Sequence, residues 1–114
     1  MTALQEEFAQ AVGLLLGKAK EFGYGVTLGE AYRTPEQAAL DAKHGTGIVN
    51  SLHIQRLAID LNFFKSGQWI QDGSQLADLG AWWKSLGPMY CWGGDFPRRP
   101  DGNHFSLSPD GVTA

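Results

Sequence analysis

The chain has 114 residues with a hydrophobic share of 43%, which allows one compact domain with a packed core and makes wholesale disorder improbable. A formal net charge of −3 argues against a general nucleic-acid binder, because such proteins usually present a basic face. The single cysteine, Cys91, excludes an internal disulfide and a cysteine-based metal cluster.

The first predicted element is an amphipathic helix. Apolar residues recur at steps of three and four over residues 4–22, which predicts one buried stripe, and Gly23 follows as a helix stop. Residues 24–28 place aromatic and β-branched side chains between glycines and predict a short strand. Residues 34–37 read Thr-Pro-Glu-Gln, which suits the start of a helix that ends near Lys43.

A period of two identifies the next strand, at residues 57–63, where apolar side chains alternate with smaller or polar ones. Asp60 therefore points away from the apolar face of this strand. Residues 65–68 predict a turn, residues 69–70 a return strand, and residues 76–86 a further helix.

The last part of the chain predicts an ordered loop over residues 90–102, which are rich in Gly, Pro and Trp. A final strand follows at residues 104–107, with His104 and Ser106 on one face. The pattern predicts a single α+β domain over residues 1–114, with helices packed on one face of a small antiparallel sheet.

The amino terminus lacks a basic region followed by a continuous apolar stretch, so we expect no signal peptide and synthesis in the cytoplasm. The apolar run at residues 12–16 is too short to span a bilayer, so no membrane anchor is expected. A substrate outside the cytoplasm would then require another protein to release this chain.

Two histidines and one aspartate, His53, Asp60 and His104, form a candidate zinc site. Zinc prefers four ligands, so three protein ligands leave a position for water, as in catalytic sites. The seven-residue spacing of His53 and Asp60 is a weak signal by itself. It gains weight because Asp60 and His104 both belong to predicted strands whose opposite faces are apolar.

Asp101 lies three positions before His104, where a carboxylate can act as a general base. Zinc lowers the pKa of bound water to roughly 7, and a nearby carboxylate can take the proton and return it to a leaving amine. Asp-Gly pairs are also common in turns, so Asp101 and Gly102 can equally form a simple turn. In that case Asp95, in the same loop, is the next candidate for the base.

The combined pattern resembles peptidase family M15, the zinc D-Ala-D-Ala carboxypeptidases and L-alanyl-D-glutamate peptidases, and in particular short phage endolysins. The family pattern is Ser-x-His, an aspartate seven residues after that histidine, and an acidic residue three positions before a second histidine. The residues that meet it are Ser51, His53, Ala58, Asp60, Asp101 and His104. Further matches are Arg33-Thr34, Glu36-Gln37, Trp92-Gly93-Gly94 and Asn103-His104-Phe105, so the resemblance runs from about residue 24 to residue 107.

This resemblance implies a fold like that of the Hedgehog and D,D-peptidase domains, with Zn²⁺ as the cofactor. It makes His53, Asp60 and His104 the zinc ligands and Asp101 the catalytic base. Arg33 becomes the candidate for polarising the scissile carbonyl and stabilising its oxyanion, because a fixed cation helps most in a partly dry site.

The resemblance also makes Ser51 and Trp92 candidates for substrate binding, although Ser51 could instead hold the ligand loop. One departure concerns Arg56, where many members carry glycine. If the backbone there needs a conformation that glycine favours, Arg56 is strained. The favoured expectation is instead that the loop differs locally, which would alter substrate contacts near the site but not the metal ligands.

The implied function is hydrolysis of the peptide stem of bacterial peptidoglycan, at the bond between L-alanine and D-glutamate, by a monomeric phage lytic enzyme acting in the cell-wall space. One alternative is a D,D-carboxypeptidase or dipeptidase, in which Arg56, Arg98 or Arg99 binds the free carboxylate of the substrate. A second alternative is a non-catalytic wall-binding domain with a structural zinc. That alternative is disfavoured because it gives Asp101 no purpose and needs a fourth protein ligand, for which His44 is the only histidine left.

Overall fold

A computed structural model describes residues 2–31, 34, 36 and 56–109 of the chain. Most of the helix predicted at residues 34–43 therefore lies outside the described residues. The same holds for three predicted site residues, Arg33, Ser51 and His53.

A small antiparallel sheet confirms the predicted α+β architecture. Within the described ranges its strands are β1 (Gly25–Leu28), β2 (Ala58–Lys65), β3 (Gln68–Trp69), β4 (Tyr90–Trp92) and β5 (His104–Leu107). The order across the sheet is β1-β2-β5-β4, and β3 pairs with the carboxyl-terminal end of β2. Strand β2 is thus central, and it places Asp60 beside β5.

The prediction of a continuous loop over residues 90–102 is wrong at its beginning. Strand β4 pairs there with β5 in the register Tyr90↔Leu107 to Trp92↔Phe105. A 3-10 helix, η2 (Gly93–Asp95), follows directly. A three-residue strand is too short to show a period of two, and its pairing depends on the neighbouring strand rather than on local preference.

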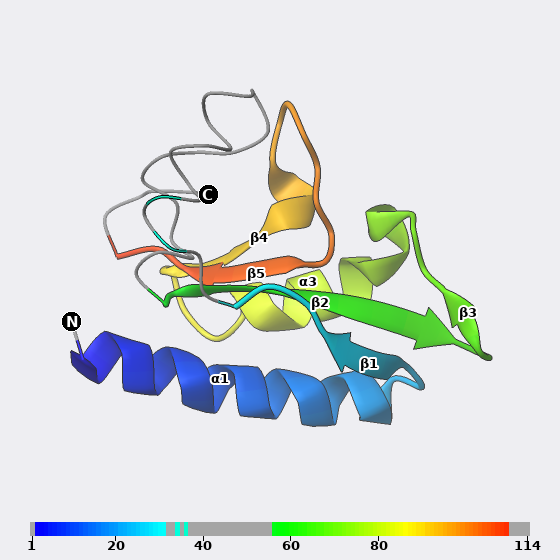
Figure 1. The fold of residues 1–114 in the computed structure, drawn as a ribbon, viewed down its shortest axis with the longest axis horizontal. Helices are drawn as coiled ribbons and strands as arrows, with labels where there is room; N and C mark the ends of the chain where they lie inside the picture. The colour runs from blue at the N-terminus through cyan, green and yellow to red at the C-terminus, as the bar shows by residue number, and fades with distance from the viewer. Residues whose placement is uncertain (1, 32–33, 35, 37–55, 110–114) are drawn as a thin grey trace.

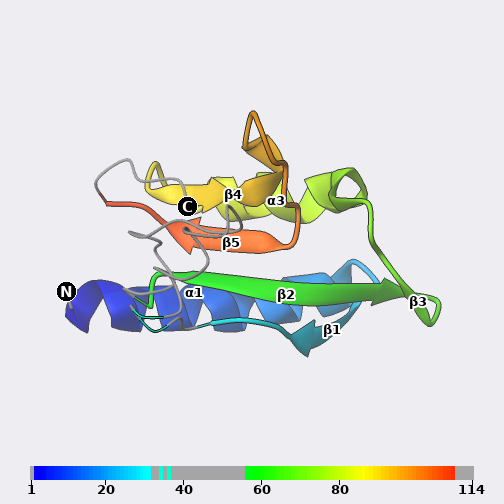
Figure 2. The same cartoon turned by 45° about the horizontal axis from the view of Figure 1, so that its top comes forward.

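The two long helices lie on one side of the sheet. Figure 1 shows α1 (Thr2–Glu21) along the lower edge of the view and α3 (Ala77–Lys84) behind β2, and in Figure 2 β2 crosses in front of α1. The two helices also contact each other. The helix predicted at residues 76–86 is found as α3, and the 3-10 helix η1 (Gly73–Leu76) directly precedes it. In the part of the chain that the structure describes, no helix is long and apolar enough to cross a membrane.

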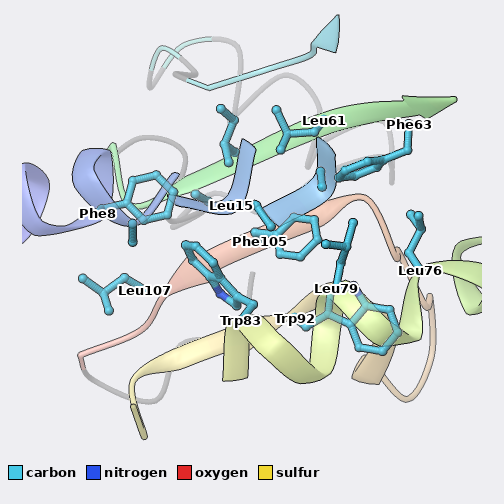
Figure 3. Close-up of a cluster of buried hydrophobic side chains, with 14 of the residues drawn as sticks. Phe8, Leu15, Leu61, Phe63, Leu76, Leu79, Trp83, Trp92, Phe105 and Leu107 are labelled. Atoms are coloured by element: carbon cyan, nitrogen blue, oxygen red, sulfur yellow. The ribbon is translucent and has the colours of Figure 1, made fainter. Parts of the chain in front are cut away.

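The core between helices and sheet is rich in aromatic rings (Figure 3). Trp83 of α3 is fully buried, and Phe8 of α1 and Phe105 of β5 meet its ring edge-on at centroid distances of 6.0 and 5.6 Å. Burying one large apolar side chain contributes about 1.5–3 kcal/mol, so these contacts fix α1 and α3 on the same sheet face. The opposite face of β2 and β5 carries the cross-strand pair of Asp60 and His104.

The backbone at Arg56 has a conformation that glycine favours, which was the less favoured of the two expectations for this position. Its φ is 58°, in the left-handed region that glycine adopts without steric cost. We expect Arg56→Gly to raise stability by about 0.5–1 kcal/mol, since relief of strain outweighs the added freedom of the unfolded chain. Thermal unfolding should then occur about 2–6 °C higher. Arg56→Ala is the matched control: it removes the same side chain but keeps the strain, so an equal gain there would contradict this explanation.

Candidate active site

Asp60 and His104 face each other across neighbouring strands. They form a cross-strand pair in the register of β2 and β5, and residues in such pairs project from the same face of the sheet. Asp60 Oδ1 lies 3.1 Å from His104 Nδ1. The side chains are 24% and 5% exposed, so the pair is accessible mainly from the carboxylate side.

Asp101 reaches the same point from the turn that precedes β5. Its backbone N–H donates to the carbonyl of Gly93 at 2.8 Å, and its own carbonyl accepts from the His104 N–H at 3.1 Å. Ligand atoms of Asp60, Asp101 and His104 all lie within 4.8 Å of one another. Asp101 is therefore a turn residue and also a member of the polar cluster.

The pKa of the Asp101 carboxyl is raised above its ordinary value. Burial is the largest cause, and the negative charge of Asp60 adds to it, while His104 and the backbone N–H of Asn103 act in the opposite direction. A carboxylate whose pKa is raised binds a proton more tightly. Tighter proton binding favours the role of a general base, which accepts a proton from water.

The donor atoms in this cluster suit a divalent cation such as zinc. Zinc is bound by histidine nitrogen and carboxylate oxygen at about 2.0–2.2 Å, so tetrahedral ligand atoms lie roughly 3.3 Å apart. The 3.1 Å separation of His104 and Asp60 is close to that value. A cation would also offset the repulsion between the carboxylates of Asp60 and Asp101. His53 lies outside the described residues, and its role as the third ligand stays a prediction.

The aromatic ring of Phe96 packs against His104 of the cluster. The sequence did not suggest this contact. The ring centroid of Phe96 lies 5.3 Å from that of His104, with the two planes tilted by 55°. This contact restricts the orientation of the imidazole and reduces the access of water to it. The available signal was a large aromatic residue in a stretch otherwise rich in Gly, Pro and charged residues.

Two further residues that the sequence suggested for the site, Asp95 and Trp92, do not belong to the cluster of Asp60, Asp101 and His104. Asp95, the fallback base, forms an ion pair with Lys84 at 2.7 Å. Trp92 is only 7% exposed and contributes to the core, and its role in substrate binding stays a prediction.

A comparison with protein-family models places the chain in a known family. The model described as D-alanyl-D-alanine carboxypeptidase, of the M15 peptidases, matches residues 44–107, which is more than half of the 114-residue chain. The chain belongs to peptidase family M15. The matched segment contains His53, Asp60, Asp101 and His104, whereas Arg33 precedes it.

The fold of this M15 peptidase is also similar to a solved structure. The crystal structure of the Serratia marcescens L-Ala D-Glu endopeptidase ChiX aligns with a TM-score of 0.72 and 18% sequence identity. The alignment covers 90% of this chain and 79% of that one. This likeness establishes the shared fold. A comparison with curated proteins gives no match.

Proposed function

We propose that this M15 peptidase is a zinc enzyme that hydrolyses the bond between L-alanine and D-glutamate in the peptide stem of bacterial peptidoglycan. The observation that carries the proposal is the cluster of Asp60, Asp101 and His104, whose ligand atoms lie within 4.8 Å of one another. The choice of bond is supported by the likeness in fold to an L-Ala D-Glu endopeptidase.

In this proposal His53, Asp60 and His104 hold the zinc ion. When bound, zinc supplies Lewis-acid chemistry: it polarises a carbonyl oxygen and acidifies a water molecule. His104 suits the role of a fixed ligand, because its ring is 5% exposed and packs against Phe96. Asp60 suits it because it lies opposite His104 in the sheet, where the strand pairing fixes both backbones.

Asp101 is the general base and, later, the general acid. It takes a proton from the attacking water as the carbon–oxygen bond forms, and it returns that proton to the amine as the carbon–nitrogen bond breaks. Its pKa is raised, first by burial, and a raised pKa favours the acceptance of a proton. Arg33 is proposed to stabilise the negative charge that develops on the carbonyl oxygen.

The biological setting that we propose is that of a phage endolysin: a monomer made in the cytoplasm that acts on the cell wall after release. This setting is supported by the resemblance of the site motifs to those of short phage lysins. The substrate is then the stem peptide.

A second candidate function is a D,D-carboxypeptidase that releases terminal D-alanine. The description of the matching family favours it. Arg98 and Arg99, both exposed, precede Asp101 closely in the chain and are candidates for binding the carboxylate of such a substrate. Arg56 is a third candidate.

Two synthetic stem peptides separate these functions. One ends in D-Ala-D-Ala, and the other has the same L-Ala–D-Glu bond but lacks the terminal D-alanine residues. We expect cleavage of both, with a new amino-terminal D-glutamate identified by mass spectrometry. Release of D-alanine from the first peptide, with the second left intact, would instead assign the carboxypeptidase function.

A further inference from the structure

The indole of Trp92 is hydrogen-bonded to the turn that carries Asp101. Its Nε1 donates to the carbonyl of Gly102, the residue after Asp101, at 2.7 Å, and the bond is buried. A side chain that is 7% exposed presents little surface to a substrate. We propose that Trp92 is a positioning residue that acts through Asp101, an inference that rests on the proposed function.

Close packing fixes the ring of Trp92 in the position from which it bonds to the Asp101 turn. A Cβ atom added to Gly80 of α3 or to Gly94 of η2 would overlap the indole ring, so both backbones pack directly on it. The Lys84 ammonium lies 5.7 Å from the ring centroid. The indole is thus fixed between α3 and η2, and its N–H has a fixed direction.

The Asp101 turn is restrained on its other sides by backbone contacts. The carbonyl of Gly93 accepts from the Asp101 N–H, and a Cβ at Gly93 would overlap the Asp101 carbonyl oxygen. A Cβ atom added to Gly73, the first residue of η1, would lie 2.6 Å from the backbone nitrogen of Gly102. These backbone contacts hold the turn against η1 and η2. The indole N–H of Trp92 differs from them because it is a side-chain group that donates a hydrogen bond to the turn.

Such restraint matters because proton transfer depends on distance. A general base must lie within about 2.6–3.2 Å of the proton donor, directly or through one water. A displacement of about 1 Å can cost about a hundredfold in rate. Without the indole N–H, the Gly102 carbonyl loses its buried donor, and the turn is free to move the Asp101 carboxylate away from the attacking water.

Trp92→Phe tests the proposal because it keeps an aromatic ring and removes the N–H. We expect kcat on peptidoglycan to fall by about 10- to 100-fold, within the range for a misplaced catalytic group, with little change in KM. The zinc content should stay at the wild-type value. In the metal-free protein, deuterium exchange over residues 93–104 should become faster.

Trp83→Phe is the matched control. Trp83 is also a buried tryptophan, and its Nε1 donates to a backbone carbonyl, that of Ser106, at 3.1 Å. Both variants should lower the unfolding temperature, but only Trp92→Phe should lower kcat markedly. An equal loss of kcat in both variants would show a general effect of destabilisation and overturn the proposal.

The decisive comparison repeats Trp92→Phe in an Asp101→Asn background. If Trp92 acts through Asp101, it should cause no further loss of kcat there. The same fold loss in both backgrounds, or no loss in either, would overturn the inference. If Trp92→Phe does not fold, Gly80→Ala takes its place, because the added methyl group displaces the same indole ring. Its effect on kcat is then compared between the wild-type and Asp101→Asn backgrounds in the same way. Failure of the proposed function looks different: the wild-type protein itself would not cleave peptidoglycan.

Discussion

Asp101→Asn should lower kcat by roughly two to four orders of magnitude, the range expected when a positioned general base is lost. Asparagine keeps the size and polarity of the side chain, so the turn hydrogen bonds made by the backbone of residue 101 should persist. The zinc content should stay near that of the wild type, because Asp101 acts on water rather than on the ion. Steady-state hydrolysis of peptidoglycan, combined with metal analysis of the same samples, checks both expectations.

The metal-free protein provides a control that does not depend on activity. The folded-state pKa of Asp101 is raised, first by burial and then by Asp60, so near its titration the folded protein binds more protons than the unfolded chain. This group's contribution to stability therefore decreases as the pH rises from its ordinary pKa through the raised value. We expect metal-free Asp101→Asn to be at least as stable as the wild type at neutral pH, and this advantage should disappear in acid.

Near-wild-type hydrolysis by Asp101→Asn would reduce Asp101 to a turn residue. Asp95, the next candidate for the general base, is poorly placed to replace it. Its carboxylate is paired with Lys84 at 2.7 Å, and it does not belong to the cluster formed by Asp60, Asp101 and His104.

His104→Ala should remove zinc, stability and activity together. The substitution deletes one proposed ligand and also the imidazole that packs against Phe96. If the wild type is measured with zinc at 1,000 times its dissociation constant, the loss of binding alone costs about 4 kcal/mol of stability. Calorimetry with and without zinc should show a large zinc-dependent shift for the wild type and none for the variant.

Ser106→Ala is the matched control for this variant. Ser106 lies two residues along the same strand, is fully buried, and its hydroxyl has no hydrogen-bond partner among the described residues. Its removal should leave zinc content and activity intact. A His104→Ala protein that still bound one zinc with wild-type affinity would exclude His104 as a ligand.

The sequence was sufficient to predict the segments that carry the site but not the way in which they meet. The alternation around Asp60 and His104 identified two strands and the faces on which these residues lie. Their direct opposition depends on the antiparallel register of β2 and β5, which joins segments 44 residues apart. No local pattern encodes that register, because it is set by packing in the folded protein.

The sequence was least informative where tertiary contacts override local preference. Strand β4 escaped prediction because three residues among glycines and prolines show no period. The buried position of Trp92 in β4 depends on Gly80, which belongs to helix α3. At Arg56 the glycine common in the family raised the possibility of backbone strain, but a local difference in the loop was the favoured expectation, because the sequence alone does not give the φ angle of 58°.

The most direct test of the central claim is to restore activity with zinc. The protein is freed of metal with a chelator, and hydrolysis of purified peptidoglycan is followed as zinc is added in steps at neutral pH. We expect no hydrolysis at the start and a linear rise that reaches its plateau at one zinc per chain, with stem-peptide fragments as the products. Full activity in the metal-free protein, or no activity after zinc is bound, would contradict the assignment of this site as a zinc peptidase centre.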